Sequence, residues 1–134
     1  MARMFNAMTN AGLAEQYDRW VLPVVGQTVS QCCIDYAVTL RCQNGVDVRI
    51  EQPFVCVTLD GREWLLAPDG DPVDLAPVLR VARRIVRSIE ALKDGHLEIR
   101  IVDGTFISVP STEDLEPWGI VGPNDMQLVS VPGG

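Results

Sequence analysis

Two stretches of the chain alternate apolar and polar residues on both sides of a short loop that ends in glycine. The first is CCIDYAVTLRCQNGVDVRIE, residues 32–51, and the second is LEIRIVDGTFISV, residues 97–109. Because successive side chains of a strand point to opposite faces, this two-residue period is typical of half-buried β-strands. In the first stretch the even positions from 32 to 42 are expected to face the core along one strand. The chain is therefore restricted to folds that contain antiparallel hairpins.

The faces of these residues also predict the length of each loop. Directly opposed residues of an antiparallel pair share a face, so a two-residue loop would place Asp47 opposite Cys42 and bury a charge. A three-residue loop over 43–45 instead places Val48 opposite Leu40, with the glycine in the left-handed conformation.

The second hairpin follows the same rule, with a loop over 102–104 that places Ile99 opposite Ile107 and Leu97 opposite Val109. The two hairpins align at their glycines. They either derive from an internal duplication or are two independent uses of a favourable turn.

Between the hairpins, the sequence FVCVTLDGREWLLAP predicts a central strand that turns at Asp60 and Gly61 into a strand containing Trp64 and Leu66.

Residues 75–93 are predicted to form a long amphipathic helix. Asp74 can cap its start, Pro77 falls in the first turn, and Gly95 follows its end. The apolar residues recur at three- and four-residue steps and form one stripe; they are Leu75, Val78, Leu79, Ala82, Ile85, Val86, Ile89 and Leu92. The solvent face would carry Arg80, Arg83, Arg84 and Arg87, interrupted only by Glu90.

These elements predict an α+β fold with a single domain over residues 17–134. Its curved, mainly antiparallel sheet is built from hairpins, and the long amphipathic helix packs on one face. Residues 1–16 show no clear period and are expected to form a flexible or weakly ordered lead-in.

The charge distribution is unusual because the formal net charge is −7, yet four of the eleven basic residues fall within residues 80–87. This cluster is either a solvent face that forms ion pairs with nearby carboxylates or a surface that binds a partner. The overall acidity makes nucleic acid and anionic membranes unlikely partners. No apolar run is long enough for a membrane span and the amino terminus does not resemble a signal peptide, so we expect a cytoplasmic protein.

Several chemistries lack the residues that they need. The chain contains one histidine, His96, and one lysine, Lys93, and no glycine-rich phosphate loop. Cys32 and Cys33 are adjacent, and Cys42 and Cys56 are isolated, so their spacing favours ordinary thiols over a zinc site. Acidic residues in turns have capping roles. We therefore expect no enzymatic activity, no catalytic residues, no metal and no cofactor.

The hairpin TLRCQNGVDVRIEQPF and the terminal EPWGIVGPNDMQLVSVPGG resemble a family of small bacterial proteins that is catalogued only as a domain of unknown function. The resemblance covers residues 22–134 and implies a strand-rich domain with a central helix, and no mechanism. The residues that carry it are Asn44-Gly45, Gly95-His96-Leu97, Asp103-Gly104, Glu116 with Trp118, and Pro132-Gly133-Gly134.

The leading hypothesis is a non-enzymatic protein-interaction module, such as an inhibitor or an immunity-like protein, acting as a monomer or homodimer. An unidentified protein partner would be engaged through the arginine face or through acidic loops. The candidate partner-binding residues are Arg80, Arg83, Arg84, Arg87, Glu116 and Trp118. The alternatives are nucleic-acid binding through the arginines, and a small-molecule-binding domain or weak hydrolase with turn carboxylates in a cleft near Trp64, Trp118 and the acidic turns.

Overall fold

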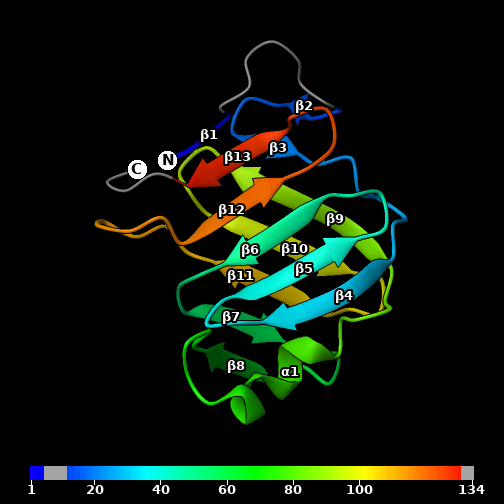
Figure 1. Ribbon diagram of the computed structural model, residues 1–134, viewed down its shortest axis with the longest axis vertical. Helices are drawn as coiled ribbons and strands as arrows, with labels where there is room; N and C mark the ends of the chain where they lie inside the picture. The colour runs from blue at the N-terminus through cyan, green and yellow to red at the C-terminus, as the bar shows by residue number, and fades with distance from the viewer. Residues whose placement is uncertain (5–11, 131–134) are drawn as a thin grey trace.

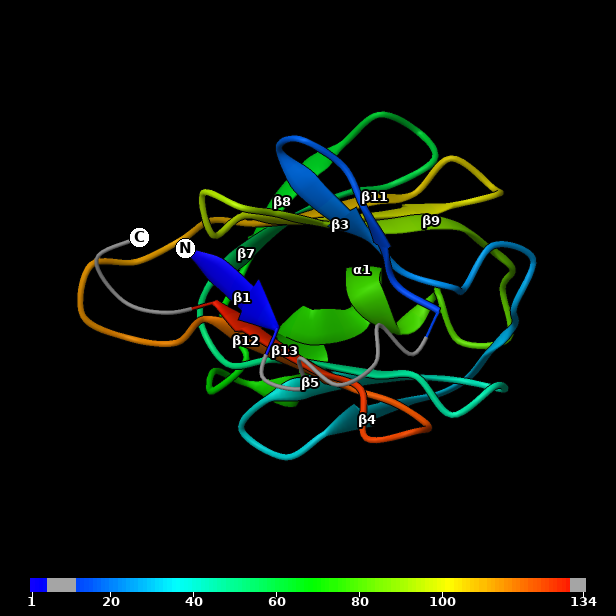
Figure 2. The same ribbon diagram turned by 90° about the horizontal axis from the view of Figure 1, so that it is seen from above.

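The protein folds into two antiparallel β-sheets that face each other (Figures 1 and 2). The computed structural model describes residues 1–4 and 12–130. Sheet A contains, in spatial order, β1 (Ala2–Met4), β13 (Gln127–Ser130), β12 (Trp118–Val121), β6 (Asp47–Ile50), β5 (Val38–Cys42) and β4 (Val29–Ile34). Sheet B contains β2 (Ala14–Glu15), β3 (Arg19–Val21), β9 (Val86–Leu92), β10 (Leu97–Ile101), β11 (Phe106–Val109), β7 (Phe54–Val57) and β8 (Glu63–Leu66).

The core lies between the two sheets and consists of the side chains that alternate strand positions direct inward. The two predicted registers are confirmed, because Leu40 lies opposite Val48 in sheet A and Ile99 lies opposite Ile107 in sheet B. All four side chains are buried. Burying such an aliphatic side chain contributes about 1.5–3 kcal/mol, which is why the two-residue period determines which face of each sheet points inward.

Four hairpin loops share one three-residue pattern in which Asn or Asp precedes glycine. These loops are 43–45, 59–61, 93–95 and 102–104. Each glycine has a φ between 83° and 103°, a region that a side chain disfavours. Each Asn or Asp side chain accepts a hydrogen bond from the backbone N–H two residues later. The predicted loops 43–45 and 102–104 are therefore two cases of a device that the chain uses four times.

The long helix predicted over residues 75–93 is wrong. A 3₁₀ turn, η1 (Pro72–Leu75), and a short helix, α1 (Ala76–Leu79), are followed by a turn and by strand β9. The first cap is Asp71, whose carboxylate accepts a hydrogen bond from the Val73 N–H at 3.0 Å, and not Asp74.

A β-bulge in β9 explains why this strand resembled a helix. Val86 pairs with Ile101 and Ser88 pairs with Arg100, so Arg87 has no partner residue on β10. The extra residue places Val86 and Ile89 on the same buried face although they are three positions apart. That spacing is also the spacing of an amphipathic helix.

The predicted α+β class, with a long helix packed on a curved sheet, is therefore wrong, and the protein is an antiparallel β structure with two sheets. The short η1–α1 segment lies at one end of the sandwich, between the layers (Figures 1 and 2). Leu75, Val78 and Val81 of this segment and its following turn are fully buried. Their role is to close the end of the core.

The strand predicted over residues 32–42 is divided by a turn. β4 ends at Ile34, and Tyr36 has a φ of 69° and an exposed side chain before β5 begins. Cys32 pairs with Leu40 and Ile34 pairs with Val38. Because paired residues share a face, the same alternation fits a straight strand and a hairpin that turns at Tyr36.

The two halves of the chain have the same topology. Strands β4–β5–β6 form a meander in sheet A, and the hairpin β7–β8 then crosses to sheet B. Strands β9–β10–β11 form a meander in sheet B, and the hairpin β12–β13 crosses to sheet A. Each crossing hairpin pairs with the meander of the other half, β7 with β11 and β12 with β6. The two halves therefore share one order of elements, and each sheet is completed by the hairpin of the other half.

The first sixteen residues, expected as a lead-in, contribute two of the described strands. β1 pairs with β13 and β2 pairs with β3. Residues 5–11 of the expected lead-in lie outside the described residues, as does the terminal Pro132-Gly133-Gly134.

Candidate partner-binding surface

The four clustered arginines lie on the turn that joins α1 to β9 and at the start of β9. Arg80 follows the last residue of α1, Arg83 and Arg84 lie in the turn, and Arg87 is the extra residue of the bulge. All four are exposed. Within residues 1–4 and 12–130, none of their side chains forms an ion pair or a side-chain hydrogen bond.

Five of the other basic side chains have acidic partners, whereas Arg62 forms no ion pair among the described residues and lies over the Trp64 ring at 4.7 Å. Ion pairs of 2.9–3.9 Å, or close contact in the case of lysine, are formed by Arg19, Arg41, Arg49, Lys93 and Arg100. The chain has 18 acidic and 11 basic residues, so carboxylates outnumber the basic side chains that could pair with them. The four neighbouring arginines of residues 80–87 lack such a partner in the described structure and therefore differ from these five ion-paired side chains.

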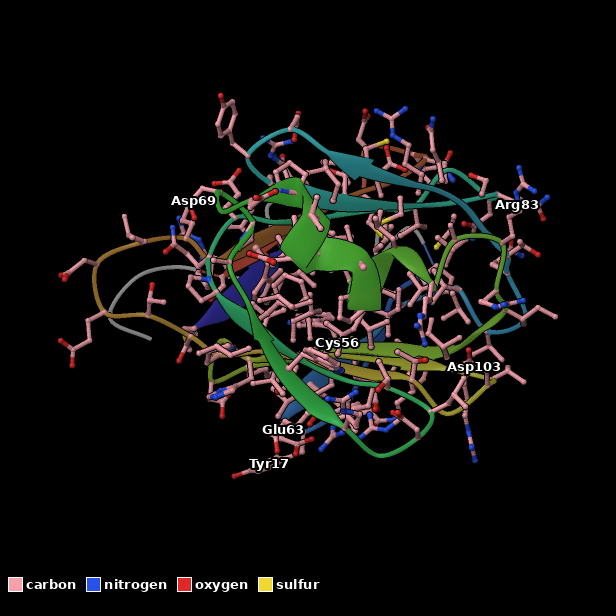
Figure 3. The ribbon with its side chains drawn as sticks, turned by 90° about the horizontal axis from the view of Figure 1, so that it is seen from below. Tyr17, Cys56, Glu63, Asp69, Arg83 and Asp103 are labelled. Atoms are coloured by element: carbon pink, nitrogen blue, oxygen red, sulfur yellow. The ribbon has the colours of Figure 1, made fainter. Side chains whose placement is uncertain are left out.

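Three of these arginines surround the β10–β11 turn. Arg83 and Arg84 line a shallow hollow of about 260 Å³ with Val102 and Asp103. Arg87 lines an adjoining hollow of about 290 Å³ with Arg100, Gly104, Thr105 and Phe106. Figure 3 shows Arg83 and Asp103 at the same side of the molecule, with the Arg83 side chain directed outward. We call Arg83, Arg84, Arg87 and Arg100 the arginine surface.

The backbone holds the turn and the arginine segment together. The N–H of Val102 donates a hydrogen bond of 2.9 Å to the carbonyl of Ile85, between Arg84 and the bulge. The Asp103 carboxylate accepts a hydrogen bond of 2.9 Å from the Thr105 N–H and so stabilises its own loop. The arginine surface therefore rests on a fixed hairpin.

Arg100 is a member of this surface that the sequence did not single out. Its guanidinium lies 4.8 Å from the centre of the Phe106 ring and forms ion pairs with Glu90 at 3.3 Å and Glu98 at 3.6 Å. These contacts fix its orientation. The alternation in LEIRI places Arg100 on an outward face, but its proximity to Arg87 depends on β9 being a strand beside β10.

Arg83 has an unfavourable backbone conformation for an arginine. Its φ is 69°, in the left-handed region that costs a residue with a side chain about 1–2 kcal/mol. Its N–H donates a hydrogen bond of 2.6 Å to the carbonyl of Val29 at the edge of sheet A. Glycine would adopt this conformation without the penalty, so an arginine at this position has an energetic cost.

Arg80 is separate from the other three and lines a hollow of about 560 Å³ at the other side of α1. This hollow lies between the edge strand β8 and the η1–α1 segment, and its lining includes Trp64, Asp74 and Pro77. The predicted single arginine face of a helix is wrong because α1 ends at Leu79.

The two remaining candidates, Trp118 and Glu116, lie elsewhere and differ from each other. Trp118 is only 1% exposed, and its indole N–H donates a hydrogen bond of 2.8 Å to the carbonyl of Gly95. Glu116 is exposed beside a hollow of about 330 Å³ on the outer face of sheet A, whose lining includes Arg41 and Arg49. Neither residue lines the hollows of the arginine surface, and the Trp118 side chain packs in the core.

The cysteines and acidic residues are arranged as ordinary parts of the fold. Burial raises the pKa of the Cys32, Cys42 and Cys56 thiols to about 11, with smaller contributions from Cys33, Asp47 and Asp103 respectively. In the described part of the chain, no group of three or more His, Cys, Asp or Glu side chains is placed to hold a metal ion. The thiols therefore remain protonated at neutral pH.

No helix among the described residues combines the length and the apolar composition that a membrane crossing requires.

The paired sheets and their repeated hairpins define a two-sheet antiparallel β protein. The chain belongs to a family of unknown function, DUF6188, which matches residues 20–134. The resemblance to a family described only as a domain of unknown function is thereby confirmed. No curated protein and no solved structure matches the chain.

Proposed function

We propose that this protein is a non-enzymatic interaction module of the cytoplasm that binds an acidic surface of a protein partner through Arg83, Arg84 and Arg87. An inhibitor or an immunity-like protein would act in this way. The observation that carries the proposal is that these three neighbouring exposed arginines have no acidic partner within the described residues, although five other basic side chains of the same acidic chain do.

Arginine suits this role because its planar guanidinium can bind a carboxylate through two parallel hydrogen bonds. The side chain is also enriched at the centres of protein interfaces. The conformation of Arg83, with its φ of 69°, supports the proposal because a residue kept at a conformational cost is a candidate for function. The adjoining apolar side chains of Ile85 and Val102, 47% and 59% exposed, supply area for desolvated contacts.

Nucleic acid is the less favoured partner. Affinity for a phosphate backbone depends on how many phosphates a protein neutralises. Three or four arginines can neutralise few of them, and a net charge of −7 opposes approach.

A small-molecule site is a second candidate, favoured by one specific observation. The hollow beside Trp64 has a volume of about 560 Å³, which is within the usual range for ligand pockets. A further hollow lies beside Trp118 on the outer face of sheet A.

The test is a comparison of two double variants with the same change in charge. Arg84→Gln with Arg87→Gln alters the arginine surface, whereas Arg41→Gln with Arg49→Gln alters the outer face of sheet A. Each protein, once shown to be folded, is used to capture partners from the native lysate, and the captured protein is then titrated by calorimetry. We expect the first variant to weaken binding about ten-fold or more and the second to leave it unchanged.

Equal loss in both variants would show a general charge effect, and unchanged capture in both would refute the arginine surface. A DNA duplex and a single-stranded RNA, both titrated at low and at physiological salt, form the second arm. Tight binding that persists at physiological salt and is lost only in the first variant would replace the protein partner with nucleic acid.

A further inference from the structure

Strand β8 forms one edge of sheet B, and half of its backbone groups have no strand beside them. The N–H of Thr58 donates to the carbonyl of Arg62 at 2.9 Å and closes the β7–β8 hairpin. In an antiparallel pair, hydrogen-bonded and non-hydrogen-bonded pairs alternate. Trp64 is therefore bonded to Cys56, whereas the peptide groups of Glu63 and Leu65 point away from β7. Among the described residues, no other strand pairs with β8.

The hollow beside α1 runs along the inner side of this edge, and Trp64, Leu65 and Leu66 are among its lining residues. Figure 1 shows β8 and α1 at the same end of the molecule. The indole N–H of Trp64 is buried and has no hydrogen-bond partner within the described structure. Leu65 is 77% exposed on the outer face, and Val73 is 77% exposed on the opposite wall of the hollow. Arg62 and Arg80 line the hollow together with Asp60 and Asp74. Arg62 lies 4.7 Å from the centre of the Trp64 ring, and neither arginine has an ion pair in the described part of the chain.

The equivalent edge in the other half of the chain is occupied. Hairpin β12–β13 has the place in sheet A that β7–β8 has in sheet B, and it is closed in the same way, by the Gly122 N–H bonded to the Met126 carbonyl at 3.0 Å. Counting from these closing pairs, Val129 corresponds to Leu65. The edge at Val129 is covered by the extended segment β1, with Arg3 opposite Val129.

The correspondence between the two hairpins also predicts which side chains of a strand added to β8 would face the core. In β1, Ala2 lies opposite Ser130 and is buried. Ser130 corresponds to Leu66, so the first inward position of an added strand would lie opposite Leu66 and the next inward position would lie opposite Trp64. An added strand would form its backbone hydrogen bonds with Leu65, in the way that antiparallel strand addition uses an exposed edge.

We infer that β8 binds an extended segment of a protein partner by antiparallel strand addition. The segment places a small or apolar residue opposite Leu66 and a side chain with a carboxylate or amide oxygen opposite Trp64. That oxygen accepts the free indole N–H and lies on the side where Arg80 lines the hollow. The inference rests on the proposed function only in requiring a protein partner, because the contact surface is different from the arginine surface.

The test uses a phage-displayed library of random peptides as the probe. The wild-type protein is compared with Leu65→Pro, which removes the outward N–H without breaking a hydrogen bond to β7, and with Leu65→Thr, which keeps it. We expect enriched peptides to bind Leu65→Thr like the wild type and Leu65→Pro about ten-fold more weakly or worse. Peptides that depend on the indole should also weaken with Trp64→Phe.

Hydrogen exchange gives a readout that needs no variant. In the free protein the amides of Glu63 and Leu65 should exchange rapidly, while that of Trp64 is protected by β7. Addition of a selected peptide should protect Leu65. If Leu65→Pro fails to fold, this protection by itself decides the question.

The failing outcomes are distinct from those of the proposed function. Peptides that bind Leu65→Pro as well as the wild type, or a library without enrichment over the empty support, would overturn the inference. Peptides lost only with Arg84→Gln and Arg87→Gln would overturn it while supporting the arginine surface. A wild-type dimer that Leu65→Pro converts to monomer would show that a second copy fills this edge, which also overturns it.

Discussion

Trp118 donates its indole N–H to the carbonyl oxygen of Gly95 at 2.8 Å, and this bond joins the two sheets of the protein. Trp118 belongs to β12 of sheet A, and Gly95 belongs to the β9–β10 loop of sheet B. The Ser130 hydroxyl donates to the same carbonyl at 3.0 Å. A buried carbonyl that accepts two hydrogen bonds is a fixed point, and the surrounding packing depends on it.

Trp118→Phe should lower the free energy of unfolding by about 1–3 kcal/mol, because the ring is largely kept while one donor of a buried hydrogen bond is lost. Trp118→Ala should cost about 3–5 kcal/mol through the cavity that it leaves. Urea denaturation measures both values. A phenylalanine variant as stable as the wild type would show that the Ser130 hydroxyl alone satisfies the Gly95 carbonyl.

Gly95→Ala and Gly104→Ala form a matched pair. Both glycines have a φ near 100°, 103° and 102° respectively, so each alanine should cost about 1–2 kcal/mol in backbone strain. A Cβ at Gly95 would also lie 2.7 Å from the Ser111 Cβ, whereas a Cβ at Gly104 meets nothing within 4 Å. Gly95→Ala should therefore be clearly the more destabilising in thermal and urea unfolding. Equal losses in the two variants would mean that the Ser111 loop moves aside without cost.

Arg83→Gly should leave stability unchanged or raise it by up to about 1 kcal/mol, because glycine accepts the φ of 69° that strains arginine. The same variant should weaken binding to a partner captured through the arginine surface. Arg84→Gly is the control, since Arg84 does not have a positive φ and should lose stability on mutation to glycine. If Arg83→Gly is the less stable of the two, the left-handed conformation is not a source of strain.

Stability should decrease at alkaline pH because of the buried thiols. Burial raises the pKa of Cys42 and Cys56 from 9.0 to about 11 in the folded protein. The unfolded chain therefore loses these protons first, and the free energy of unfolding falls as the pH rises from 9 towards 11. Urea unfolding of the wild type and of Cys42→Ala with Cys56→Ala should show a weaker alkaline loss in the variant. Parallel curves would assign the loss to other groups.

The same thiols should react slowly with Ellman's reagent in the native protein at neutral pH. The thiolate is the reactive form, and burial keeps Cys42 and Cys56 protonated and covered. All four cysteines should react at once in denaturant. A native protein that releases all four equivalents immediately would contradict the burial of these side chains.

The sequence by itself was sufficient to predict the hairpins β5–β6 and β10–β11, because their loops and registers depend on local interactions. Asn44 and Gly45, or Asp103 and Gly104, specify a three-residue loop because the first side chain bonds to the backbone and the second accepts a positive φ. The alternation on either side then determines the register, since a shift by one residue would bury the charge of Asp47. The clustering of basic residues at 80–87 was likewise visible in the sequence.

Only the tertiary structure decided how these pieces combine. The spacing of Val86 and Ile89 fits a helix and equally a bulged strand. The choice depends on the pairing of β9 with β10, and no residue near Arg87 marks the bulge in the sequence. The alternation around Tyr36 fits a straight strand and a hairpin for the same reason. Pairing between strands far apart in the chain, as of β6 with β12 and of β7 with β11, is a long-range contact whose energy appears only when both halves are folded. Pairing of β9 with β10 sets Arg87 beside Arg100, and pairing of β1 with β13 covers the edge of β13, whereas among the described residues β8 pairs only with β7.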